Sequence, residues 1–109
     1  KNLLLILFFG CSFQLRAQSV FSEKYSSRAD IKIYVVDHMS SADLIVYKTE
    51  YSSQAQGNKG LWYFEEYSSR ADKTIFFVDY ASQADLKVFF TDYQSQAGWR
   101  NVSLKHLMY

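Results

Sequence analysis

One six-residue motif recurs along this chain, and a regular recurrence limits the possible folds more than any bulk property does. The motif Tyr-x-Ser-x-Ala-Asp occurs in full at residues 25–30 and again at residues 67–72. Altered copies begin at residues 38, 51, 80 and 93, so successive copies start 13 residues apart except for one interval of 16. Such a period is the signature of a repeat architecture. A repeated residue serves each unit structurally, whereas catalysis needs a constellation that occurs once.

Residues 1–17 have the pattern of a secretory signal peptide. Residues 3–9 are continuously apolar, and Ala17 is a suitable last residue before a cleavage site. The apolar run is too short to span a bilayer as a transmembrane helix. We therefore expect an exported protein, periplasmic or secreted, that begins at Gln18. A lipoprotein anchored through Cys11 is the alternative, and a buried terminal strand or helix is a third interpretation.

The rest of the chain, residues 18–109, is expected to form a single repeat-built all-β domain with a short tail at 102–109. The sequence has 109 residues, of which 49% are hydrophobic and 18% aromatic, so it can fill one dense core. Without the signal segment, ten basic residues face eleven acidic ones, a net charge of −1. The basic residues are scattered, which argues against a nucleic-acid partner. No cysteine remains, so stability must come from packing rather than from disulfides.

Apolar runs between the copies of the motif have the length and the Val, Ile, Phe and Tyr content of strands. They cover residues 31–36, 44–49, 61–65, 74–78 and 87–91, with half-units at 19–23 and 99–103. The sequence thus predicts about seven short strands and no substantial helix. In the connections, Ser27 and its copies are interpreted as caps of a single helical turn.

Aligning the units places one aromatic residue in every full strand. This column contains Tyr34, Tyr47, Tyr63, Phe76 and Phe89. The positions on either side of it are mostly apolar as well. Because side chains alternate between the two faces of a strand, both faces should be at least partly covered. The pattern predicts a compact layered all-β fold, such as a small two-layer sandwich or a short solenoid.

The repeats also resemble a known family. The Tyr-x-Ser-x-Ala-Asp units, the strand at residues 86–92 and the segments 60–63 and 95–99 are similar to a small bacterial family of unknown function, noted for a seven-crossing torus knot called a septoil. The resemblance covers about residues 19–101 and implies an all-β knotted fold. It supplies no activity. The chain departs from the family at His38, where Tyr is expected, and at Gln56, where Asp is expected.

Repeated carboxylates suggest one enzymatic hypothesis, a carboxylate-dependent hydrolase. One column holds Asp30, Asp43, Asp72 and Asp85, and another holds Asp37, Glu50, Glu66, Asp79 and Asp92. Aspartate is a common turn and cap residue, so we favour a structural role for these columns. His38 and His106 belong to no ligand cluster of recognisable spacing, and the sequence predicts neither a metal nor another cofactor.

The one irregular place is the insertion that lengthens the third unit. We take Gly57, Asn58, Lys59, Gly60 and Trp62 as the candidate binding residues, because loops that interrupt a regular scaffold often carry function. The expected protein is a non-catalytic exported β domain, structural or partner-binding, whose partner is a protein or a carbohydrate. Aromatic-mediated carbohydrate binding is a further alternative. For it, the tyrosine that opens each motif is a better surface candidate than the strand aromatics.

Overall fold

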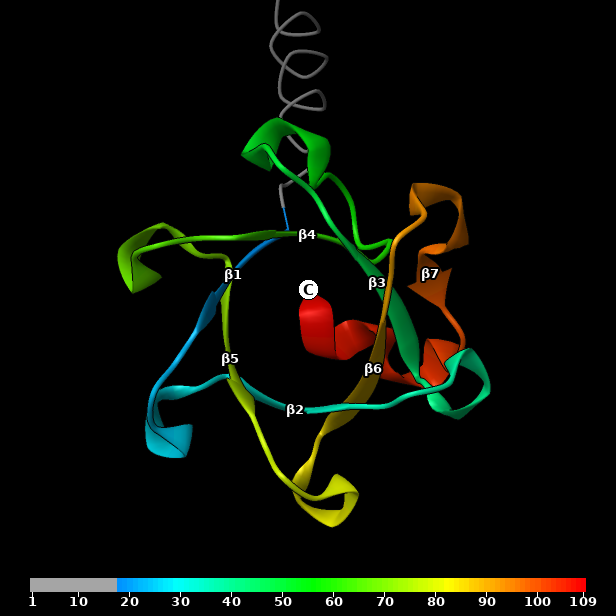
Figure 1. Ribbon diagram of the computed structural model, residues 1–109. Coiled ribbons are helices and arrows are strands. Elements are labelled where there is room, and N and C mark those ends of the chain that lie inside the picture. Colours follow the sequence, from blue (N-terminus) through cyan, green and yellow to red (C-terminus); the bar gives the residue numbers. More distant parts are fainter. Residues whose placement is uncertain (1–17) are drawn as a thin grey trace, which may run out of the picture.

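The computed structural model describes residues 18–109 (Figure 1). Its strands are β1 (Ser19–Ser22), β2 (Ile31–Val35), β3 (Leu44–Lys48), β4 (Leu61–Phe64), β5 (Lys73–Phe77), β6 (Leu86–Thr91) and β7 (Gly98–Trp99). Seven strands lie where the sequence predicted them. The last is shorter than expected, because β7 ends at Trp99 and residues 102–108 turn into a 3-10 helix.

Six of the strands close into a parallel barrel, seen end-on in Figure 1. The hydrogen-bonded order is β4-β1-β5-β2-β6-β3, and β3 pairs with β4 to complete the ring. The two-layer arrangement that we expected is therefore wrong. Both faces of each strand are apolar because one lines the interior of a closed wall and the other is its partly covered outer surface.

Consecutive strands skip one place in the ring. β1, β2 and β3 take alternate places, and β4, β5 and β6 fill the gaps between them. The chain thus winds around the barrel axis twice, and the second winding is interleaved with the first. In a ring of six places, three steps of two places would bring the chain back to the place of β1. One step must therefore differ, and it is the step from β3 to its direct neighbour β4.

The insertion in the third unit lies in this exceptional step. Twelve residues connect β3 to β4, whereas eight residues connect β1 to β2, β2 to β3, β4 to β5 and β5 to β6. β4 begins opposite Tyr47, so it pairs with only the second half of β3. The first half of β3 pairs with β7, which runs antiparallel to it. The extra residues therefore shift β4 along β3 and leave room for the last strand.

The barrel interior is filled by alternate side chains of every strand. One layer of it takes a fully buried residue from each of the six barrel strands. These residues are Val20, Ile33, Val46, Trp62, Ile75 and Val88. The aromatic column points the other way and is half-buried on the outer wall. The sequence-based assignment of these columns to opposite faces is confirmed.

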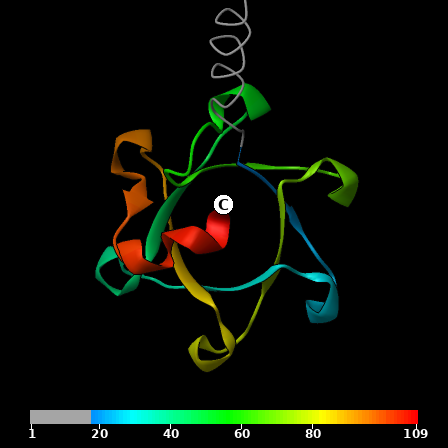
Figure 2. The ribbon, with the colours of Figure 1, turned by 180° about the vertical axis from the view of Figure 1, so that it is seen from behind.

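The helix η8 (Val102–Met108) closes the end of the barrel at which the strands begin. Met108 is fully buried in the core, and Leu104 and Leu107 pack against it. The Gln18 Nε2 amide donates to the Met108 carbonyl oxygen at 2.9 Å. The C-terminus accordingly lies near the barrel axis in both Figure 1 and Figure 2.

Six three-residue 3-10 turns project outward as the corners of a six-pointed star (Figures 1 and 2). They are η2 (Ser26–Arg28), η3 (Met39–Ser41), η4 (Ser52–Gln54), η5 (Ser68–Arg70), η6 (Ala81–Gln83) and η7 (Gln94–Gln96). The tyrosine of the motif, or His38 in η3, precedes each turn in an extended conformation. The prediction that a serine side chain caps each turn is wrong. In η2, for example, the closing bonds run from the backbone N–H groups of Arg28 and Ala29.

Candidate functional site

The first column of repeated aspartates joins neighbouring strands. Its members are Asp30, Asp43, Asp72 and Asp85. Each donates its backbone N–H to a carbonyl oxygen of the next strand in the ring, and its carboxylate accepts the N–H of that same residue. The bonded residues are 44 or 53 positions apart in the sequence, so each pair ties one winding to the other. Because the four carboxylates lie at four corners, they form no acid–base pair.

Removing one of these carboxylates should cost measurable stability. Asp72 Oδ2 accepts the Ser19 backbone N–H at 3.1 Å and the Ser19 hydroxyl at 3.3 Å, in a part-buried setting. We expect Asp72→Ala to lower the free energy of unfolding by about 1–3 kcal/mol, because the Ser19 N–H loses its acceptor. Asp72→Asn keeps an acceptor oxygen and should cost less. Urea unfolding compares the two, and equal midpoints would contradict this role.

The insertion at residues 57–59, part of the candidate binding loop, contacts the C-terminal segment. Asn58 accepts the Trp99 indole N–H through both its backbone and its side-chain oxygen, at 3.1 and 3.0 Å. Its side-chain amide donates to the Lys105 carbonyl oxygen at 2.9 Å. Within this loop, Lys59 is exposed and Gly57 is half-buried. The loop thus holds β7 and η8 against the barrel.

Two of the five candidate residues are closed to any partner. Gly60 is buried where β3, β4 and β7 meet, and an added Cβ would lie 3.1 Å from the Gly98 nitrogen. The Trp62 side chain is fully buried inside the barrel. Trp62 follows the rule that inward-facing strand positions are core, and its burial leaves no exposed side-chain surface for a partner.

The opposite end of the barrel, where the strands end, is rich in aromatic side chains. The last inward-facing positions of four strands hold Lys48, Phe64, Phe77 and Phe90; Lys48 is exposed, and the three phenylalanines are partly buried against the core. The Lys48 ammonium lies 5.1 Å from the Phe64 ring centroid and 4.9 Å from that of Phe90. Phe90 also packs against Phe64 and Phe77, each with centroids 6.4 Å apart. Lys48 is the one charged residue in a column of apolar side chains, and this exception is visible in the sequence.

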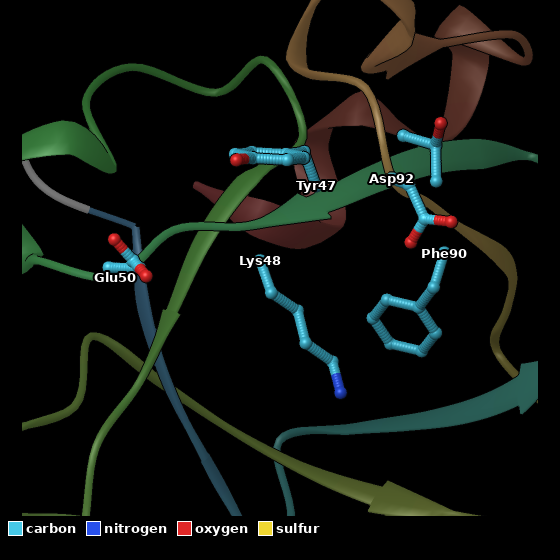
Figure 3. Close-up of a pocket in the computed structure, with 6 residues that line it drawn as sticks. Tyr47, Lys48, Glu50, Phe90 and Asp92 are labelled. Carbon is cyan, nitrogen blue, oxygen red and sulfur yellow. The ribbon is translucent and has the colours of Figure 1, made fainter.

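A pocket of about 480 Å³ lies beside Lys48, where β3 and β6 end (Figure 3). Its lining includes Lys48, Phe90 and two carboxylates, Glu50 and Asp92. Both acids are exposed to solvent, and Figure 3 shows them on opposite sides of Lys48. A carboxylate pair for hydrolysis would be close and at least partly buried. This pocket therefore gives the hydrolase hypothesis no support.

The most repetitive exposed feature is a set of five corner tyrosines. Tyr25, Tyr51, Tyr67, Tyr80 and Tyr93 precede their turns with φ between −132° and −120° and are 58–67% exposed. Side chains this exposed add little to the packing of the barrel. The corners thus present one aromatic group in one backbone setting at five places around the molecule.

The barrel, its corners and its interleaved winding can be compared with known proteins. A family model described as the 7(1) septoil knot domain, Septknot, matches residues 17–100. The chain belongs to the Septknot family. The knot of this family accounts for the double winding, in which each unit passes a strand of the other winding. Neither the curated proteins nor the solved structures gave a match to the chain.

The described part of this Septknot domain carries no sign of metal chemistry or of a membrane span. Among residues 18–109, no three His, Cys, Asp or Glu side chains are grouped so that they could hold a metal ion. No helix in the same residues is long and apolar enough to cross a bilayer. The expected signal segment and Cys11 lie outside the described residues.

Proposed function

We propose that this Septknot domain is an exported, non-catalytic binding module that holds a polysaccharide through its corner tyrosines. The observation that carries the proposal is the set of five equivalent tyrosines, 58–67% exposed, at five of the six corners of the star. Export rests on the signal pattern of residues 1–17. A polymer of repeating sugars offers the same contact many times, and this protein presents the same exposed tyrosine at five corners.

Tyrosine at an exposed corner fits carbohydrate chemistry. The ring offers a flat apolar surface on which the C–H face of a sugar can stack, and the hydroxyl can hydrogen-bond to sugar hydroxyls. Its side chain has only two rotatable bonds, so ordering it on binding costs little entropy. Five weak contacts on one scaffold can then bind a long chain much more tightly than one of them could.

The pocket beside Lys48 is a competing location for the ligand, and a set of variants distinguishes it from the corner tyrosines. Changing all five corner tyrosines to serine should weaken polysaccharide binding at least about tenfold, because avidity is lost with the contacts. The variant should remain folded, since each exposed substitution changes the free energy of unfolding by no more than about 0.5 kcal/mol. Affinity electrophoresis in gels that contain amylose, dextran or polygalacturonate measures the retardation.

The matched control is Lys48→Gln, which alters the pocket and leaves the corners intact. We expect Lys48→Gln to bind the polysaccharides as the unchanged protein does. If Lys48→Gln abolishes retardation and the tyrosine variant is still retarded, the pocket beside Lys48 is the binding site. If neither protein nor variant is retarded by any of the polymers, the proposal is wrong.

A further inference from the structure

Two of the six corners form a matched pair that the sequence alone does not bring together. η2 and η5 carry the identical motif Tyr-Ser-Ser-Arg-Ala-Asp, 42 residues apart in the chain. η2 connects β1 to β2 and η5 connects β4 to β5, and these strands alternate in the ring. The two corners are therefore neighbours on one side of the star, as both Figure 1 and Figure 2 show.

In both corners an arginine is held over the tyrosine. The guanidinium carbon of Arg28 lies 5.4 Å from the Tyr25 ring centroid, and that of Arg70 lies 5.4 Å from the Tyr67 centroid. Tyr25 and Tyr67 remain 59% and 58% exposed, against 65–67% for the three tyrosines without an arginine. The arginine thus covers only a small part of each ring. A guanidinium held over an aromatic face by a cation–π contact still has N–H groups that can donate to a ligand.

The arginines are a local feature of this pair. The corresponding position is glutamine in η4, η6 and η7 and serine in η3. The corner aspartates Asp30 and Asp72 accept hydrogen bonds from the neighbouring strands, which partly offset their charge. Residues 18–109 have a net charge of −1, so the molecule as a whole does not attract polyanions. An anionic ligand would be held by these two corners in particular.

We infer that the ligand is an anionic polysaccharide and that η2 and η5 are its principal contacts; this inference rests on the proposed function. A guanidinium forms two parallel hydrogen bonds with a carboxylate or a sulfate group. The tyrosine beside it stacks on the sugar that bears the group. Two such corners side by side take two anionic sugars of one chain, so affinity rises once an oligosaccharide is long enough to reach both.

The decisive variant is the double substitution Arg28→Gln with Arg70→Gln. Glutamine occupies this position in the other corners, so the fold accommodates it. The charge-matched control is Lys87→Gln with Arg100→Gln, which removes two exposed cations from other parts of the surface. Titration calorimetry at physiological ionic strength, where long-range attraction is screened, measures the affinity of the full-length protein. The probes are dextran sulfate with neutral dextran, polygalacturonate with its shorter oligosaccharides, and poly-L-glutamate.

We expect dextran sulfate, polygalacturonate or both to bind more tightly than neutral dextran. The polymer that binds more tightly shows whether the corners recognise sulfate or carboxylate groups. The arginine variant should weaken this binding at least about tenfold and the control less than about twofold. Equal binding of dextran and dextran sulfate, unchanged in the arginine variant, would overturn the anionic assignment while leaving the tyrosine proposal standing. Poly-L-glutamate binding as tightly as polygalacturonate would overturn the saccharide assignment. Failure of every saccharide to bind would overturn both.

Discussion

Replacing Gly60 with alanine should lower the free energy of unfolding by about 3 kcal/mol or more, enough to unfold much of the protein. Gly60 has φ +85°, a region that residues with a side chain rarely adopt. The new Cβ would also meet the Ile45 carbonyl oxygen well inside van der Waals contact. Backbone cannot move aside as a flexible side chain can. This contact lies where the two windings and β7 meet.

Gly57→Ala is the matched control for that experiment. Gly57 has a similar φ of +74°, but the atoms nearest its added Cβ belong to the flexible side chain of Lys59. Gly57→Ala therefore introduces the backbone strain without the clash, and we expect it to lower the free energy of unfolding by about 1 kcal/mol. Guanidinium unfolding followed by circular dichroism compares the two. Equal losses in both variants would show that φ alone matters and that the strand junction tolerates a methyl group.

Removing the Trp62 side chain should cost about 3–5 kcal/mol, the range for emptying a buried aromatic site. Trp62 is fully buried and packs against Phe64 and Phe90, with ring centroids 6.2 and 6.4 Å away. Its indole N–H has no acceptor among the described residues, so Trp62→Phe removes an unsatisfied donor along with some volume. Trp62→Phe should therefore lose much less stability than Trp62→Ala.

Tyr80→Ala provides the comparison for Trp62→Ala. Tyr80 is 67% exposed at its corner, so its removal should shift the stability by no more than about 0.5 kcal/mol. Thermal unfolding ranks the stability of the three variants and of the unchanged protein. A Trp62→Ala protein as stable as Tyr80→Ala would mean that the barrel interior is not packed as the structure shows.

The sequence was informative about strands and faces because those follow from local chemistry. Alternation placed Ile33 and Val46 on one face and Tyr34 and Tyr47 on the other, as the structure has them. The pairing of the strands could not be predicted, because near-identical units do not encode which strand lies next to which. The place of β7 depends on a long-range register, because β4 pairs with only the second half of β3 and leaves the first half to β7.

For the candidate site, too, the sequence shows the local features but not the contacts between residues far apart in the chain. The extra residues 57–59 are visible in the sequence, but the contacts of Asn58 are not, because its partners lie at Trp99 and Lys105, more than forty residues away. The second copy of the full motif was also visible, but sequence period cannot say that η2 and η5 are neighbours. The burial of Trp62 follows from its inward-facing position in a strand, although it lies close to the loop in sequence.

The interleaved winding has a consequence for how this protein is made on the ribosome. β1 pairs with β4 and β5, β2 with β5 and β6, and β3 with β4, β6 and β7; among residues 18–60 no strand pairs with another. At about 5–20 residues added per second, the first three strands wait on the order of seconds for any partner. A nascent chain that stops before β4 therefore has unpaired strand edges throughout, the kind of surface that aggregates.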